Sequence, residues 1–279
     1  MTGAQLAAIE AEVRPGPTRA TVVLVPGYTG SKEDFVGVLQ PLVDEGYHVL
    51  AVDQLGQHES THAGETSRYA VDALARDVLD VVAGLGRPVH LLGHSFGGLV
   101  ARAAVLASPS AVRSLTLLGS GPAALPSARA DRLRLLLPAL GQLSLEQIWV
   151  AMRDLDADAG LPRPPAAVEA FLHRRFVGND PAALWVMGHA LLDEPDRTQA
   201  LRETGLPVHV CYGEADDAWL PATQASMAQH LAAAHTVVPG AAHSPAAENP
   251  EATAKILTAF WSDVDADSER DGASDSPSR

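Results

Sequence analysis

Six short, almost wholly apolar runs recur along this chain, and longer segments with helical periodicity separate them. Strands that are apolar on both faces are typical of a parallel sheet that helices cover on each side. The alternation therefore predicts an α/β fold with a mostly parallel sheet flanked by helices. The expected strands are Ala20–Pro26, His48–Asp53, Val89–Gly93, Val112–Leu118, Pro207–Tyr212 and His235–Val238.

The segments between these runs place apolar residues on one side of a helix. Before the first run, residues 9–13 alternate apolar and polar side chains, which favours an edge strand over a short helix at residues 4–12. The Asn249–Pro250 pair is typical of a helix start. The helices expected between and after the strands span residues 34–45, 68–85, 96–107, 220–234 and 250–264.

Residues 121–204 interrupt this alternation. They contain no convincing strand and instead predict helices at 128–140, 144–155, 166–176 and 181–192. We interpret the stretch as an α-helical cap inserted between two core strands, although extra surface helices are an alternative. The core would then comprise residues 1–120 and 205–264. Residues 265–279 are rich in Asp and Ser, and they predict a disordered acidic tail.

Composition narrows the classes of partner. The chain has 279 residues, 47% of them hydrophobic, and a formal net charge of −14, which argues against nucleic acid and anionic membranes. It has no apolar run long enough for a transmembrane helix, and its first residues lack the features of a signal peptide. The single cysteine, Cys211, lies in an expected buried strand and is interpreted as a packed thiol. We expect a cytoplasmic protein with a small-molecule substrate.

The pentapeptide Gly93-His94-Ser95-Phe96-Gly97 lies where an expected strand meets an expected helix. A serine flanked by glycines at such a junction is typical of a nucleophile elbow, a sharp turn that presents the hydroxyl group. Glycine tolerates the unusual dihedral angles and the close backbone contacts of that turn. Because the five-letter pattern also occurs by chance, its interpretation depends on the rest of the chain.

A serine nucleophile needs a general base, and the base needs a group that orients it. His243 lies in a loop of small residues between the last expected strand and the last helix, where it would face the elbow. Asp216 follows the preceding strand and is our choice for the orienting acid, with Glu214 and Asp217 as alternatives. The order Ser, Asp, His along the chain is the order that this type of site requires.

Acyl transfer also needs donors for the oxyanion that develops on the substrate. We expect one donor to be the backbone N–H of Phe96, immediately after the serine and at a helix N-terminus. The other is expected in the glycine-containing loop after the first strong strand, where the N–H of Tyr28 is the candidate.

From about Arg19 to Trp261 the chain resembles the α/β-hydrolase superfamily. The loop at 26–31 is similar to the family's His-Gly-x-x-Gly-Ser oxyanion motif, and the loop at 53–60 is similar to its Asp-x-x-Gly-x-Gly-x-Ser motif. The elbow at 93–98 and the loops at 213–216 and 240–244 match the family's nucleophile, acid and histidine loops in order. The resemblance implies the α/β-hydrolase fold and a serine esterase that acts without a cofactor.

The chain departs from the family's pattern at two places. Pro26 stands where the family usually has a histidine, and Gln57 and His58 replace the region of the second glycine in the Asp53 loop. The turn after Asp53 is therefore expected to differ. A serine at the elbow disfavours the chemistry of the family's dehalogenases and epoxide hydrolases, whose nucleophile is an aspartate.

Several aromatic residues and histidines have both a functional and a structural interpretation. Four aromatic residues are candidates for the substrate pocket, although core packing explains them at least as well: Trp149, Phe171, Trp185 and Trp219. His58 and His62 are interpreted as surface residues rather than ligands, so no metal is expected. The chain lacks a dinucleotide-binding motif and the spacing of a phosphate-binding loop, so no such cofactor is expected.

The sequence is also compatible with two other functions. The same three residues serve carbon–carbon bond hydrolysis, lyase and perhydrolase chemistry in the superfamily that the chain resembles. A hydrolase-like fold can also serve as a binding protein without catalysis, although such proteins commonly have a damaged triad.

Overall fold

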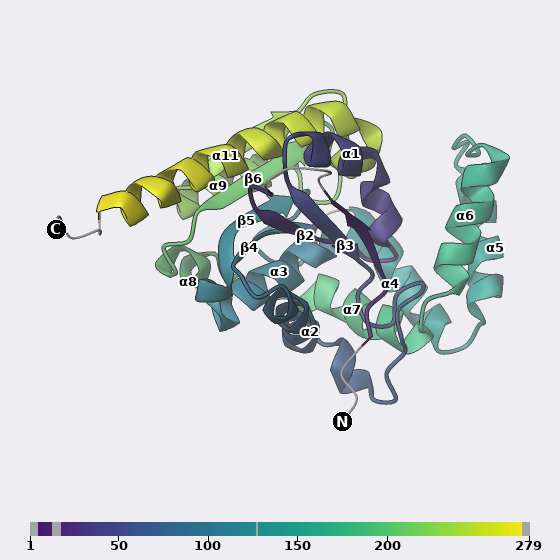
Figure 1. Cartoon of the computed structure of the whole chain (residues 1–279). Helices are drawn as coiled ribbons and strands as arrows, with labels where there is room; N and C mark the ends of the chain where they lie inside the picture. Colours follow the sequence, from purple (N-terminus) through teal and green to yellow (C-terminus); the bar gives the residue numbers. More distant parts are fainter. Residues whose placement is uncertain (1–4, 13–17, 127, 275–279) are drawn as a thin grey trace.

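The computed structural model describes residues 5–12, 18–126 and 128–274. Its centre is a twisted seven-stranded sheet with the order β1-β3-β2-β4-β5-β6-β7 (Figure 1). The edge strand β1 pairs antiparallel with β3, and the other neighbours are parallel. The strands are β1 (Ala8–Ala11), β2 (Thr21–Val25), β3 (His48–Val52), β4 (Val89–His94), β5 (Val112–Leu118), β6 (Val208–Gly213) and β7 (Ala234–Val238).

Helices cover both faces of this sheet. Alternate residues of β2 belong to two separate apolar clusters, with Val23 on the side of α2 and α3 and Leu24 on the side of α1 and α11. The helices are α1 (Val36–Asp44), α2 (Val71–Gly84), α3 (Phe96–Ala107), α4 (Ala128–Leu140), α5 (Leu145–Asp158), α6 (Ala166–Val177), α7 (Pro181–Asp193), α8 (Thr198–Glu203), α9 (Pro221–Leu231), α10 (Pro245–Glu248) and α11 (Pro250–Ser274).

The sheet confirms the predicted fold class. Each end of the six predicted core strands lies within one residue of the observed end, and the edge strand forms at Ala8–Ala11. Residue 13 of the predicted edge strand lies outside the described residues. The short helices α8 and α10 were not predicted, and the helix expected at 34–45 begins as a 3₁₀ turn at Lys32–Phe35. Among the described residues, no helix combines the length and apolar character needed to cross a membrane.

The prediction of a disordered tail from residue 265 is wrong for residues 265–274, because α11 continues to Ser274. The side chain of Asp265 is largely buried and accepts hydrogen bonds from His90 at 3.1 Å and Arg113 at 2.5 Å. These bonds attach a segment with many charged and few apolar residues to the sheet. The hydrophobicity of the sequence alone does not reveal such an attachment. Residues 275–279 lie outside the described part of the chain.

Helices α4–α7 leave the core and return to it through a narrow neck. The backbone N–H of Ala124 donates to the carbonyl of Glu194 at 2.9 Å, so the outgoing and returning chains lie side by side. Arg102 of α3 is 1% exposed and donates to the carbonyl of Pro122 on one side of the neck and to the Glu194 carboxylate on the other. In Figure 1, α5 and α6 stand apart from the body of the molecule, whereas α7 lies against it.

Candidate active site

The junction between β4 and α3 turns sharply at Ser95, whose φ and ψ are 54° and −120°. A Cβ on Gly93 would lie 2.2 Å from the carbonyl oxygen of Gly97. A Cβ on Gly97 would lie 2.4 Å from the carbonyl oxygens of Val25 and Pro26. Both distances are too short for any side chain, so this turn requires glycine on each side of the serine.

Ser95, His243 and Asp216 form one chain of hydrogen bonds. His243 Nε2 lies 3.0 Å from Ser95 Oγ, and His243 Nδ1 lies 3.0 Å from Asp216 Oδ1. The three residues follow β4, β7 and β6, so the carboxyl ends of parallel strands bring them together. An ionised carboxylate only accepts, which assigns the proton to Nδ1 and leaves Nε2 free to accept from the serine hydroxyl.

Two further donors hold Asp216. Ala218 N–H donates to Oδ1 and Gln224 Nε2 donates to Oδ2, both at 2.9 Å. Gln224 was missed by the sequence reasoning, because a glutamine within a helix carries no local signal of this role. The alternatives Glu214 and Asp217 are exposed, and Asp217 pairs with Arg129 at 2.7 Å.

The loop that carries His243 is also held by side chains. His94 Nε2 donates to the carbonyl of His243 at 2.8 Å. Burial, and then the neighbouring His243, lower the pKa of His94 below its usual range, so His94 is neutral at pH 7. Glu248, another residue that the sequence did not single out, accepts from the N–H groups of Ser244 and Ala242.

The two candidate oxyanion donors flank the serine. Neither the Tyr28 N–H nor the Phe96 N–H has an acceptor among the described residues. A Cβ on Gly27 would lie 3.0 Å from Ser95 Cβ, so the loop that carries Tyr28 closely approaches the serine. The first N–H groups of a helix have no intrahelical acceptor, which leaves the Phe96 N–H available to a ligand.

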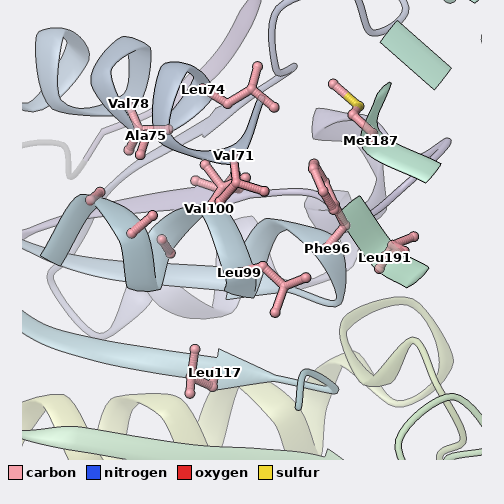
Figure 2. Packing of buried hydrophobic residues seen from close by; sticks show 14 of the residues in the cluster. Val71, Leu74, Ala75, Val78, Phe96, Leu99, Val100, Leu117, Met187 and Leu191 are labelled. Atoms are coloured by element: carbon pink, nitrogen blue, oxygen red, sulfur yellow. The ribbon is translucent and has the colours of Figure 1, made fainter. Parts of the chain in front are cut away.

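The side chains of the same two residues contact α7. The Tyr28 hydroxyl donates to the carbonyl of Leu184 at 3.0 Å. Figure 2 shows the Phe96 side chain beside Met187 and Leu191. Helix α7 therefore packs against both residues, and Ser95 and His243 are each only 7% exposed.

The four predicted pocket aromatics lie in different surroundings. Trp149 packs against Phe176 and His173 of α6, and Phe171 contacts His58 in the loop after β3. Their role in a pocket stays a prediction.

The other two aromatics differ in burial. Trp185 is 46% exposed, and its ring contacts that of His189 at an interplanar angle of 43°. Trp219 is fully buried, donates to the carbonyl of Ala123 and occupies the space where a Cβ on Gly121 would lie. The position of Trp219 between Gly121 and the Asp216 loop is consistent with core packing. For Trp185 and Trp219 alike, a role in the pocket stays a prediction.

His58 lies with Glu33 and Glu59 in a cluster whose ligand atoms are all within 4.8 Å of one another. Lys32 Nζ lies 2.9 Å from Glu33 and 2.7 Å from Glu59, so an ammonium group already supplies positive charge to both carboxylates. His62 instead contacts the carbonyl of Gly178. Cys211 is buried in β6, and burial raises the pKa of its thiol to about 12, as suits a packed rather than a reactive cysteine.

Comparison with known proteins identifies the family. A model of the alpha/beta hydrolase family matches residues 22–256. Lipase 3 of Moraxella sp. is 23% identical over 254 residues, which span 87% of this chain and 78% of that protein. The 2-succinyl-6-hydroxy-2,4-cyclohexadiene-1-carboxylate synthase of Enterobacter sp. is 28% identical over 242 residues, which span 85% and 89% of the two chains.

One shorter sequence match and two solved structures are also similar to this chain. The putative carbamate hydrolase RutD of Variovorax paradoxus is 36% identical over 107 residues, and the match spans 38% of this chain and 40% of that protein. A carboxylesterase from Nitrososphaera gargenis superposes with a TM-score of 0.77 at 17% identity, over 95% and 96% of the chains. An esterase from Thermogutta terrifontis gives 0.76 at 21% identity, over 94% of each. These structures share the fold.

Proposed function

The chain belongs to the alpha/beta hydrolase family, and within it we propose a serine hydrolase that cleaves an ester or a related acyl substrate. The observation that carries this proposal is the continuous hydrogen-bonded chain from Ser95 through His243 to Asp216. Such an arrangement supplies a nucleophile, a general base and a group that orients the base. The similarity to lipases and esterases supports the same class of substrate.

In the first half of the reaction, Ser95 Oγ attacks the acyl carbon while His243 Nε2 takes the hydroxyl proton. Asp216 holds the imidazole in the required tautomer and stabilises the imidazolium ion. The tetrahedral intermediate collapses as His243 returns the proton to the leaving alcohol, which leaves an acyl group on Ser95. Water then attacks the acyl-enzyme by the same steps, releases the acid and restores the serine.

We assign the stabilisation of the negatively charged oxygen in the tetrahedral intermediate to the N–H groups of Tyr28 and Phe96. Both lie beside Ser95 and have no acceptor among the described residues. One such donor contributes about 2.7–4 kcal/mol to transition-state stabilisation in hydrolases where it has been removed. No metal or redox group takes part in these steps.

Helices α4–α7 are proposed to act as a cap that covers the site and limits substrate size. The hydrogen bond from Tyr28 to Leu184 and the low exposure of Ser95 support this role. The neck formed by Ala124 and Glu194 supports a cap that ends before α8, because α8 packs on α3 and α9 of the core.

A second candidate is cleavage of a carbon–carbon bond by the same residues. Two relatives named as 2-hydroxy-6-oxononadienedioate/2-hydroxy-6-oxononatrienedioate hydrolases favour it, because the substrate in that name has no ester bond to cleave. Turnover of β-diketone-like substrates but not of esters would support this candidate and reject the first.

The test of the proposed function compares Ser95→Ala with the wild-type protein on p-nitrophenyl esters. Loss of the nucleophile is expected to lower kcat by about 10⁴–10⁶. Ser110→Ala, which changes an exposed serine after α3, is the matched control and should retain full activity. A fluorophosphonate probe should label the wild-type and Ser110→Ala proteins at Ser95, and unchanged turnover in Ser95→Ala would reject the proposal.

A further inference from the structure

Two buried glutamines in the loop after β3 hold the loop after β2. Gln57 Nε2 donates to the carbonyl of Gly27 at 2.8 Å, and Gln54 Nε2 donates to the carbonyl of Pro26 at 2.9 Å. Gln57 is 0% exposed and Gln54 is 1% exposed. The two bonds therefore join the Asp53 loop to the loop that approaches Ser95.

The orientation of the Gln57 amide is determined by both of its ends. Its Oε1 accepts from the backbone N–H of Gln54 at 3.1 Å, so the opposite end must be the nitrogen that faces Gly27. The carbonyl of Gly27 also accepts from the N–H of Gly30 at 3.1 Å. Two donors therefore fix the direction of this one carbonyl group.

That carbonyl shares a peptide group with the Tyr28 N–H. The peptide is planar and trans, so its C=O and N–H point in opposite directions. A donor that fixes the Gly27 carbonyl on one side therefore fixes the Tyr28 N–H on the other side, away from Gln57. A hydrogen bond to the carbonyl also polarises the peptide, which strengthens the N–H as a donor.

We propose that Gln57 is a positioning residue for the oxyanion site, acting through the Gly27–Tyr28 peptide. The inference rests on the proposed function, because it assigns Gln57 to the stabilisation of the same tetrahedral intermediate. Gln57 does not touch the substrate. Its side chain holds and polarises the peptide whose N–H receives the oxyanion.

Gln54 provides a matched comparison. It makes the same kind of buried bond from the same loop, but to the carbonyl one peptide earlier. That peptide carries the N–H of Gly27 and not that of Tyr28. If the two glutamines only stabilise the loop, substitution of either should have similar effects, whereas a positioning role makes Gln57 the more important for catalysis.

The experiment compares Gln57→Met and Gln54→Met on a p-nitrophenyl ester and on the corresponding thionoester, whose sulfur is a weak hydrogen-bond acceptor. Gln57→Met is expected to lower kcat for the oxygen ester by about 10- to 100-fold, part of the effect of losing one oxyanion donor, with little change in KM. The kcat for the thionoester should fall much less, so the ratio of the oxygen-ester rate to the thionoester rate decreases. Gln54→Met should leave that ratio at the wild-type value.

The ratio is measured on a single preparation, so a partly unfolded fraction cancels from it. If Gln57→Met does not fold, Gln57→Leu is the second variant, because it also removes the donor without adding a charge, and the same fall in the ratio is expected. An unchanged ratio in the folded Gln57 variant, with turnover that still depends on Ser95, overturns this inference alone. Retained turnover in Ser95→Ala overturns the proposed function and this inference with it.

Discussion

Asp265, in the C-terminal half of α11, accepts a hydrogen bond from Nε2 of His90, near the start of β4, at 3.1 Å. The ring of His90 is fully buried, and its Nδ1 lies 2.7 Å from Ser114 Oγ of the neighbouring β5. Asp265 also pairs with Arg113 and accepts from Tyr47 at 3.4 Å. One carboxylate therefore joins the last helix to two neighbouring strands of the sheet, β4 and β5.

Replacing Asp265 with alanine is expected to destabilise the protein by about 1–3 kcal/mol, because a buried donor of His90 loses its acceptor. The free energy of unfolding in urea measures the effect. Asp267→Ala is the matched control, since Asp267 lies on the same helix and its side chain is 70% exposed. Equal effects of the two substitutions would contradict a structural role for the Asp265–His90 bond.

Arg102→Met is expected to cost about 3–5 kcal/mol, because it leaves the buried carboxylate of Glu194 without its fully buried partner. Adding Glu194→Met to this variant should recover part of the loss, since no isolated charge then remains. Arg197→Met removes a more exposed partner of Glu194 and should cost less. The free energy of unfolding of the three variants in urea tests whether the Arg102–Glu194 ion pair stabilises the neck. A decrease of less than about 1 kcal/mol for Arg102→Met would refute that role.

Gly97→Ala is expected to disturb the elbow, because the new methyl group would lie 2.4 Å from two backbone carbonyl oxygens. A displacement of Ser95 by about 1 Å can lower activity by about 100-fold. Gly84→Ala is the control, since a Cβ there has no atom within 4 Å and should leave activity unchanged. Steady-state kinetics on a p-nitrophenyl ester, with thermal unfolding as a check on folding, decide between the two outcomes.

Stability is expected to fall as the pH decreases from about 6.5 to about 4. Burial, and then the neighbouring His235, lower the pKa of His209 from 6.5 to about 4. Between these values the unfolded chain binds a proton that the folded chain does not, so the contribution is fully present above pH 6.5 and is lost below it. His209→Gln should make the free energy of unfolding less dependent on pH in this window. An exposed imidazole serves as the control, and His230→Gln should leave the slope unchanged.

The sequence predicted the features that depend on local pattern. The apolar runs predicted the parallel strands, and the small residues around Ser95 and His243 predicted loops at the carboxyl ends of those strands. Because parallel strands place these ends at one edge of the sheet, residues far apart in the chain were expected to meet there. The structure brings Ser95, Asp216 and His243 together by hydrogen bonds.

Features that depend on distant contacts were not predictable in this way. The segment after residue 264 is poor in apolar residues, and its helix is fixed to the sheet by His90, which lies far away in the sequence. Gln224 carries no signal in the sequence, and Gln57 stands out only as part of an altered turn. Each acquires its hydrogen bond only when another loop brings a carbonyl or a carboxylate to its side chain. Left-handed backbone at His58 (φ 42°) likewise shows that the altered turn tolerates a side chain where the resembled motif has glycine.

The neck at Ala124 and Glu194 has a consequence for how this molecule can change over evolution. Since the chain leaves and rejoins the core at adjacent points, helices α4–α7 can be lengthened, shortened or exchanged without altering the pairing of β5 with β6. The residues that we propose to perform the chemistry lie outside the exchanged part. If helices α4–α7 limit the substrate as proposed, new substrate preferences can arise by replacing one module while the proposed reactive centre is inherited unchanged.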